Sequence, residues 1–400
     1  MSEVRDGLPE SKRGTAGSYE TSDPRTHYAE LDALRGIAII GVVMTHLASF
    51  WFIGTRQQLE VPLLRMNLLS YFNLGYLGVS LFFLLSGYLL TWTEEKRARR
   101  SAYSLLSYAK RRALRLIPAY YVAIVLVVVL WPTRPSLGDV ALLFTFLHGF
   151  RPQFPVGLDP AVWSLTPEVA FYAMLPFLVL KLRSLPQRLA VFGVLATVSV
   201  VTRFLMEYGV FESPQLFGGT LADNRMYFYP TTLLYLFIAG MLLRMMVERI
   251  ETGRIPDGWR HTAALISTVV PVVVLATLPY LVRRQDLLGS PLAFVAEGMM
   301  ILFFAAALLG SPILKPLLNW RPLASLGKIS YSLFLLHMTV IYLTIRYVLS
   351  ENRSWLAEQS ELVTWGVFLA YMIFVLTVAT ALSYLSYRYV ESPFLRQKPK

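Results

Sequence analysis

The chain contains no cysteine among its 400 residues. That absence excludes disulfide bonds, thiolate nucleophiles and cysteine-ligated metal sites. The sequence also lacks the P-loop, the Gly-x-Gly-x-x-Gly fingerprint, the His-Glu-x-x-His zinc motif and the Gly-x-Ser-x-Gly nucleophile elbow. We therefore predict no metal site and no permanently bound cofactor, and expect histidine, arginine and carboxylate groups to carry any chemistry.

Charged side chains are also scarce. They make up 16% of the chain, whereas 55% of its residues are hydrophobic and the mean hydropathy is +0.52. Soluble domains carry about 25% charged residues. The composition therefore predicts a polytopic membrane protein. The net charge of +12 is distributed in short patches between apolar runs, where Lys and Arg set topology, so we exclude nucleic acid as a partner.

Apolar runs of about 20 residues, long enough for a helix to cross a bilayer, recur along the chain. A shorter run, 137–150, is expected to form a re-entrant or interfacial helix. The fold class predicted is all-α, with about ten transmembrane helices plus this short one. The long runs are 33–53, 70–92, 116–132, 164–183, 189–208, 228–246, 262–282, 291–312, 328–349 and 362–386.

The distribution of charge predicts the orientation in the membrane. Residues 1–30 are polar and are expected to form a flexible cytoplasmic tail, followed by one membrane-embedded domain over 31–395. Ten spans place both termini on the same side. Of the 37 Lys and Arg residues, 26 fall on the proposed inner side and 10 on the outer. The positive-inside rule therefore places both termini in the cytoplasm.

The first apolar run carries two polar side chains, Arg35 and His46. Eleven helical residues advance by about 1100°, only about 20° beyond three turns, and rise by about 16 Å. Both side chains therefore share one face, with Arg35 beside Asp32 near the inner boundary and His46 about halfway through the membrane. A polar residue at that depth faces the bundle interior or a wet cavity; a hydrogen bond to a neighbouring helix is the alternative explanation.

These residues lie in LRGIAIIGVVMTH (34–46), which resembles the opening motif of the acyltransferase 3 family of integral-membrane O-acyltransferases. Together the matching motifs span nearly the whole chain in the expected order, which is far more specific than any one of them. The further matches are GVSLFFLLSGYLL (78–90), RRALRLIPAYY (111–121), WSLTPEVAFY (163–172), GKISYSLFLLH (327–337) and YVESPF (389–394).

The resemblance implies O-acyl transfer from an acyl-CoA, usually acetyl-CoA, to a hydroxyl of a carbohydrate, glycolipid or related exported product. It also implies that Arg35 and His46 are catalytic. A histidine could remove the proton of the acceptor hydroxyl or carry the acyl group itself, and the sequence leaves both open. Some relatives carry a fused extracellular hydrolase-like domain. We recognise none here, so we expect direct transfer or delivery to a separate extracytoplasmic transferase.

Eight basic and two acidic residues occupy 93–115. Arg112 and Arg115, three residues apart on one helical face, are expected to hold the phosphates of coenzyme A, and the basic motif of the family falls on them. Arg111 is expected to support them. The alternative is a purely topogenic cluster that contacts anionic membrane lipid.

Glu168 follows Thr166 and Pro167 in a sequence that suits the start of a helix, with Thr166 as N-cap. There an acid could simply complement the helix dipole. Glu168 is also about 20 Å above the inner end of its span, by helical rise, so we expect it to orient or charge-stabilise His46. The 137–150 segment is expected to pack nearby.

Three consecutive residues, Ser86, Gly87 and Tyr88, are assigned to the wall of the donor pocket, although small residues there could serve only helix packing. His337 could be a second histidine in a wet cavity or a structural one. Glu391 is expected to pair with Arg388 or a neighbouring loop.

Two functions of other classes are the alternatives. A secondary transporter for a small polar or anionic substrate could use Arg35, His46 and Glu168 as its binding or proton site. The absence of a strong internal repeat and the basic motif count against it. A non-catalytic membrane scaffold is the third possibility and would not depend on His46.

Overall fold

The computed structural model describes residues 24–55, 60–61, 66–67, 71–72, 74–100, 103–130, 135–150, 161–207, 230–253, 259–281 and 291–397. Its longer helices are α1 (Pro24–Thr55), α3 (Leu77–Arg100), α4 (Leu105–Leu130), α6 (Leu165–Lys181), α7 (Leu185–Glu207), α8 (Leu234–Glu251), α9 (Arg260–Leu281), α10 (Pro291–Leu308), α13 (Ser330–Thr344) and α15 (Glu361–Ser386). Its short elements are α5 (Leu137–Phe144), α11 (Lys315–Leu318), α12 (Arg321–Lys328), α14 (Arg353–Ala357), α16 (Ser392–Arg396), β1 (Glu60–Val61) and β2 (Met66–Asn67).

The prediction of an all-α polytopic membrane protein is confirmed. Within the described ranges, nine helices are long and apolar enough to span a membrane. Each of the ten predicted apolar runs falls on one of the longer helices; the run 291–312 corresponds to α10, whose described apolar part is shorter than the others. The 137–150 run contains only the eight-residue α5 and a single turn at His148–Phe150, too short to span.

Two helices begin earlier than predicted. α4 begins at Leu105, eleven residues before the apolar run at 116–132, so the basic motif forms its first turns and its arginines have fixed directions. α1 begins at Pro24, a residue that suits the first turn of a helix. Part of the segment predicted as a tail, 24–30, is therefore helical, and the rest of it lies outside the described residues.

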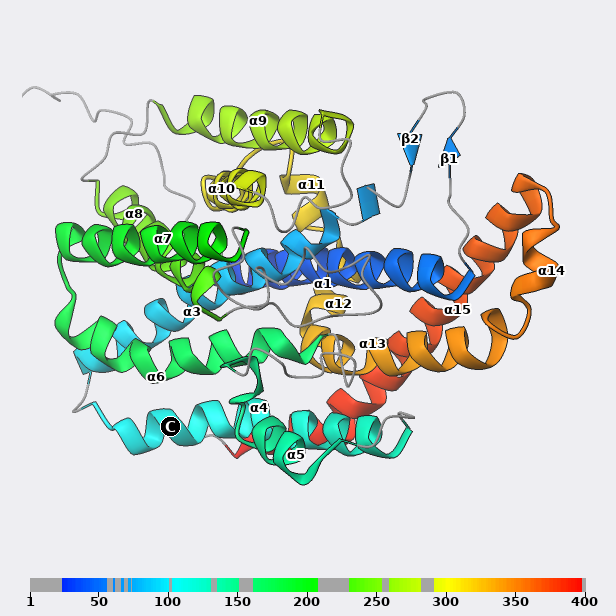
Figure 1. Cartoon of the computed structure of the whole chain (residues 1–400). Helices are drawn as coiled ribbons and strands as arrows, with labels where there is room; N and C mark the ends of the chain where they lie inside the picture. Colours follow the sequence, from blue (N-terminus) through cyan, green and yellow to red (C-terminus); the bar gives the residue numbers. More distant parts are fainter. Residues whose placement is uncertain are drawn as a thin grey trace, which may run out of the picture.

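α1 runs through the middle of the molecule, with α7 to α10 on one side and α4 to α6 on the other (Figure 1). It packs against α3, α12 and α13. Gly327 of α12 permits a close approach, because an added Cβ there would lie 1.7 Å from the backbone oxygen of Asp32. This contact holds the end of α12 against the N-terminal part of α1, beside the residues described below.

Thr166 joins the short α5 segment to α6 and is not the N-cap that we predicted. Its hydroxyl donates to the carbonyl oxygen of Phe146 at 2.9 Å and accepts from the amide of Gly149 at 3.2 Å. α6 starts at Leu165, one residue before Thr166, and no side chain caps its N-terminus. These two hydrogen bonds hold the 137–150 segment near Glu168, as expected.

A buried ion pair lies in the half of the bundle formed by α7, α8 and α10. One nitrogen of Arg203 is 2.7 and 2.9 Å from the two carboxylate oxygens of Glu297. The hydroxyl of Tyr235 also donates to Glu297. Neither charged side chain is more than 4% exposed. Burying two charges is favourable only when they satisfy one another, so this cluster fixes how α7 and α10 pack.

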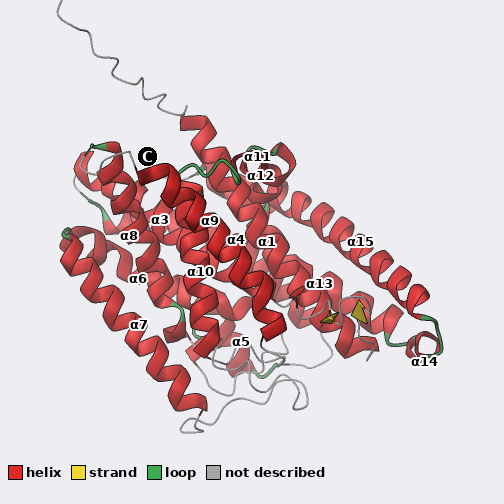
Figure 2. Ribbon diagram, turned by 90° about the horizontal axis from the view of Figure 1, so that it is seen from above, coloured by secondary structure: helices red, strands yellow, loops and turns green. Residues whose placement is uncertain are grey.

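The beginning of α1 and the end of the chain lie at the same end of the bundle (Figure 2). Arg35 near the start of α1 lines the same cavity as Tyr387 and Leu395, which follow α15.

Candidate active site

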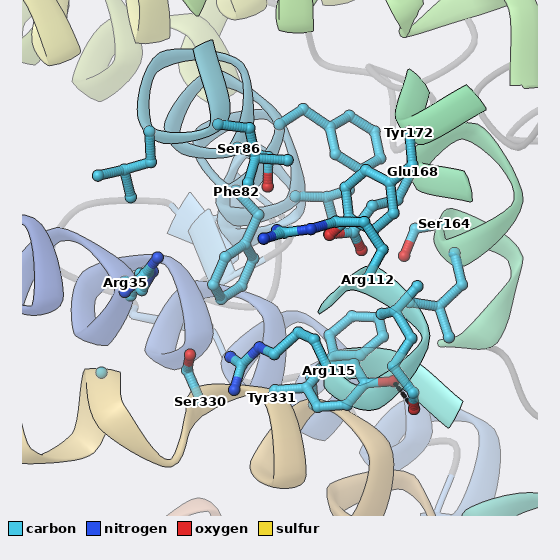
Figure 3. A pocket seen from close by; sticks show the side chains of 18 of the residues that line it. Arg35, Phe82, Ser86, Arg112, Arg115, Ser164, Glu168, Tyr172, Ser330 and Tyr331 are labelled. Atoms are coloured by element: carbon cyan, nitrogen blue, oxygen red, sulfur yellow. Dashed lines mark hydrogen bonds between the residues drawn. The ribbon is translucent and has the colours of Figure 1, made fainter. Parts of the chain in front are cut away.

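A cavity of about 380 Å³ opens among α1, α3, α4, α6, α12, α13 and the residues that follow α15 (Figure 3). Its surface is rich in charge for a membrane protein interior. The ionisable acids and bases that line it are Asp32, Arg35, Arg112, Arg115, Glu168 and Lys328. Four are cationic and two are acidic, so the described lining has an excess of positive charge.

Arg115 is held at one side of the cavity. Its guanidinium forms an ion pair with Glu391 and lies 5.3 Å from the ring centre of Tyr331. Glu391, only 1% exposed, also accepts a hydrogen bond from Ser332 at 3.1 Å. The expected partner of Glu391 was Arg388 or a nearby loop; it is instead an arginine from the distant α4. Arg115 therefore has a fixed position with part of its surface exposed to the cavity.

Arg112 lies one turn before Arg115, and its guanidinium extends into the cavity toward Phe82 and Ser86 (Figure 3). Its guanidinium lies 5.9 Å from the ring centre of Tyr108 and 5.7 Å from that of Tyr172. The hydroxyl of Tyr108 donates to the backbone oxygen of Tyr172 at 2.8 Å, which fixes the two rings. Nε of Arg112 is buried and has no hydrogen-bond partner in the described part of the chain. A buried donor of this kind favours a ligand that brings an acceptor.

Arg35 lies on the α1 side of the cavity, and its Nη1 donates to Asp32 at 2.7 Å. Its side chain is 33% exposed. Because helical side chains lean toward the N-terminus, Arg35 points toward the start of α1 and away from His46.

Glu168 lies in the same cavity, where it accepts a hydrogen bond from the hydroxyl of Tyr172, one turn later in α6. It therefore shares the cavity with Arg35, Arg112 and Arg115. The expected contact between Glu168 and His46 does not occur: the recorded partner of His46 is another imidazole, and His46 is not among the residues that line the cavity.

His46 lies beyond the deep end of the cavity. Its Nδ1 is 2.9 Å from Nε2 of His337 in α13. Phe334, one turn before His337, lines the cavity, and its ring centre is 6.1 Å from that of His337. Phe82 also lines it and meets Phe334 edge-on at 6.5 Å. Phe334 therefore contacts both the cavity and His337.

Of the other predicted donor-pocket residues, only Ser86 lines the cavity. Gly87 faces α8, where an added Cβ would lie 2.0 Å from the carbonyl oxygen of Phe237. Tyr88 is 1% exposed. Arg111 is buried in an ion pair with Glu94 at 2.9 Å. Gly87 and Tyr88 are therefore not part of the cavity wall, because they are turned away from Ser86 by about 100° and 200° around the helix. Arg111 supports the cavity at most indirectly, through its pair with Glu94.

The structure also brings in residues that the sequence reasoning missed. Tyr172 follows Glu168 by four residues, a spacing that places two helical side chains in contact, so its role could have been predicted. Tyr331 and Phe334 lie within GKISYSLFLLH, the segment whose match to the family was already noted. Lys328 lies in the same motif and Phe82 in GVSLFFLLSGYLL, but neither was singled out within its motif.

The fold and the cavity together define a class: a multi-pass helical membrane protein with an arginine-lined pocket at one end and paired histidines beyond it. Arginines offer planar, bidentate donors that match phosphate and carboxylate groups. The profile of the family described as "Acyltransferase domain" matches residues 28–384. The chain therefore belongs to the acyltransferase 3 family, as its motifs predicted.

Bacterial relatives extend this comparison. The chain is 26% identical over 386 residues to the O-acetyltransferase OatA of Staphylococcus aureus (strain NCTC 8325 / PS 47), which covers 92% of this chain and 57% of that protein. It is 25% identical over 414 residues to YrhL of Bacillus subtilis (strain 168), provisionally named a peptidoglycan O-acetyltransferase, covering 95% and 56%. The chain thus spans a little more than half the length of these relatives. No solved structure matches the chain.

Proposed function

We propose that this protein is an acyl-CoA-dependent O-acyltransferase that moves an acetyl group to a hydroxyl of a cell-surface glycan or glycolipid. Membership of the family and the names of the relatives support acetyl transfer. One observation carries the proposal of a coenzyme A donor: Arg35, Arg112 and Arg115, from two helices, line one cavity.

The arginines bind the phosphates of the donor. Arg115 is already oriented by Glu391 and Tyr331, and Arg112 is oriented by stacking between two tyrosines. Preoriented side chains lose little entropy when a ligand binds. The unsatisfied Nε of Arg112 gains an acceptor when a phosphate oxygen arrives. This pairing offsets the desolvation of both groups.

Arg35 belongs to this donor site rather than to the reacting carbonyl. It is eleven residues from His46, a rise of about 16 Å, and it is directed back to Asp32. Its position among the other arginines supports a role in holding the donor. Glu168, which faces the same arginines, keeps Tyr172 in place and limits the excess positive charge.

The pantetheine arm of the donor extends from the arginines past Phe82 and Phe334 to His46. There the acceptor hydroxyl gives its proton to the imidazole as its oxygen attacks the thioester carbon. The carbon–sulfur bond breaks, and the leaving thiolate takes up the proton from the imidazole. The acceptor reaches His46 from the outer side, with both termini of the chain in the cytoplasm, and a separate extracytoplasmic transferase is an optional recipient.

The test is transfer or hydrolysis with purified protein and acetyl-CoA. Because the chain has no cysteine, a thiol reagent reports released coenzyme A without any signal from the protein. We expect His46→Gln to lower the turnover by about 10²- to 10⁴-fold, the usual contribution of a general base. His261→Gln, in an exposed position on α9, is the matched control. Substrate uptake into liposomes without thiol release would establish the transporter instead.

A further inference from the structure

The two histidines beyond the cavity form a chain of hydrogen bonds that ends on the backbone. Nδ1 of His46 lies 2.9 Å from Nε2 of His337, and Nδ1 of His337 lies 3.0 Å from the carbonyl oxygen of Leu333. His337 is fully buried on α13, whereas His46 is only partly buried. The buried imidazole thus has both ring nitrogens occupied.

This chain has a direction. A carbonyl oxygen only accepts hydrogen bonds, so Nδ1 of His337 carries a hydrogen. A neutral imidazole carries only one, which leaves Nε2 of His337 as an acceptor. The hydrogen between the two rings must then belong to Nδ1 of His46. A cationic His337 would reverse this assignment, but neither imidazole hydrogen-bonds a carboxylate within the described ranges, and an unpaired charge is costly inside a membrane.

We propose that His337 is a positioning residue that fixes the tautomer and the ring direction of His46. With its hydrogen on Nδ1, His46 presents a lone pair on Nε2, the nitrogen that has no recorded partner among the described residues. That nitrogen takes the proton of the acceptor hydroxyl. The Nδ1 hydrogens of both rings stay in place throughout the step, and the Leu333 carbonyl and His337 stabilise the resulting imidazolium, as second-group contacts do for other histidine bases.

This inference rests on the proposed function, in which His46 is the base. It adds that His337, 291 residues away in the sequence, selects the tautomer in which His46 can act as a base. The role differs from packing, because a residue of the same shape without an acceptor atom would preserve the helix contact and lose the tautomer.

Two variants and one spectroscopic signature test the proposal. His337→Phe retains an aromatic ring and removes the acceptor. His337→Gln keeps an acceptor, since its amide oxygen can reach the position of Nε2. The turnover of acetyl-CoA is expected to fall by about 10- to 100-fold in His337→Phe, the scale seen when a supporting contact is lost. The KM for acetyl-CoA should stay within about twofold, and His337→Gln should recover most of the turnover.

The signature is the 15N spectrum of histidine-labelled protein. The chain has five histidines, and His46→Gln identifies the signals of His46 by their loss. In the parent protein, Nδ1 of His46 should be protonated and Nε2 should not; in His337→Phe the pattern should change. If Nε2 of His46 carries the hydrogen in the parent protein, the proposal is wrong. Equal turnover in His337→Phe and the parent would also overturn it.

The outcomes separate this inference from the proposed function. If His46→Gln retains full turnover, the base assignment fails, while the 15N spectrum still reports on the tautomer. If His337→Phe does not yield monodisperse protein, His337→Asn replaces it, since its side chain is one methylene shorter than that of Gln and cannot reach His46. Equal turnover of the Asn and Gln variants would then contradict the proposal.

Discussion

The donor site is tested most sharply at Arg112, through the change Arg112→Gln. Arg112 forms no recorded ion pair in the described part of the chain, and it lies between Tyr108 and Tyr172. Its removal therefore breaks no salt bridge that holds the fold together. Gln keeps a polar side chain of similar reach up to the amide but removes the charge and the bidentate donors. Any loss of donor binding then reports on the ligand contact itself.

The magnitude follows from the chemistry of the contact. A hydrogen bond to a charged group contributes about 1.5–3 kcal/mol, and each 1.4 kcal/mol is a factor of about ten. The KM for acetyl-CoA should rise by about 10- to 100-fold. Because Arg112 is only partly buried, the lower part of this range is expected. The turnover number should change little, since the phosphates lie far from the reacting carbonyl and the contact is equal in ground and transition states.

Thiol release from acetyl-CoA by purified protein measures both constants. Lys110→Gln is the control, because it removes one positive charge from an exposed position on the same helix, two residues away. Arg112→Lys should give an intermediate KM, since it keeps the charge and loses the planar fork. If Arg112→Gln and Lys110→Gln give the same KM as the parent protein, Arg112 does not hold the donor and the cavity is not its phosphate site.

Three further predictions concern stability. Gly87→Ala should lower the thermal unfolding temperature in detergent while the folded fraction keeps its KM for acetyl-CoA, because the added Cβ meets the Phe237 carbonyl; a raised KM with unchanged stability would restore Gly87 to the donor pocket. Glu297→Leu should destabilise by about 3–5 kcal/mol, and the double variant with Arg203→Leu should recover much of this; full additivity of the two changes would contradict the buried pair. Thr166→Val should cost about 1–3 kcal/mol through two lost hydrogen bonds, measured by chemical denaturation, and no change would show that the α5 segment is held by other contacts.

Much of the fold was accessible from the sequence because lipid imposes a simple rule: a crossing helix needs about 20 apolar residues. The short run 137–150 was correctly separated from the spans on the same ground. The positions of helix starts were less accessible. α4 begins well before its apolar run, because a basic segment can continue a helix outside the membrane without any change in hydropathy.

The site was predictable where one helix decides the geometry. Arg112 and Arg115, three residues apart, do share a face. Gly87 and Arg111 point to other helices instead, toward Phe237 and Glu94, and such contacts were not accessible from the spacing. Contacts between distant segments were not accessible: His46 meets a histidine 291 residues away, and no local pattern names that partner. The expected contact between Glu168 and His46 rested on their similar depth. Helical rise gives the height of a residue and not its direction around the bundle.

The pair between Arg115 and Glu391 joins residues 276 positions apart, and this separation affects how the protein is made. A chain emerging from the ribosome inserts Arg115 long before Glu391 exists. Until the last long helix arrives, that guanidinium lacks its Glu391 partner, and the cavity lacks one wall. Expression of the protein should therefore leave the stretch around Tyr387 to Leu395 intact, and a purification tag is best separated from it by a linker.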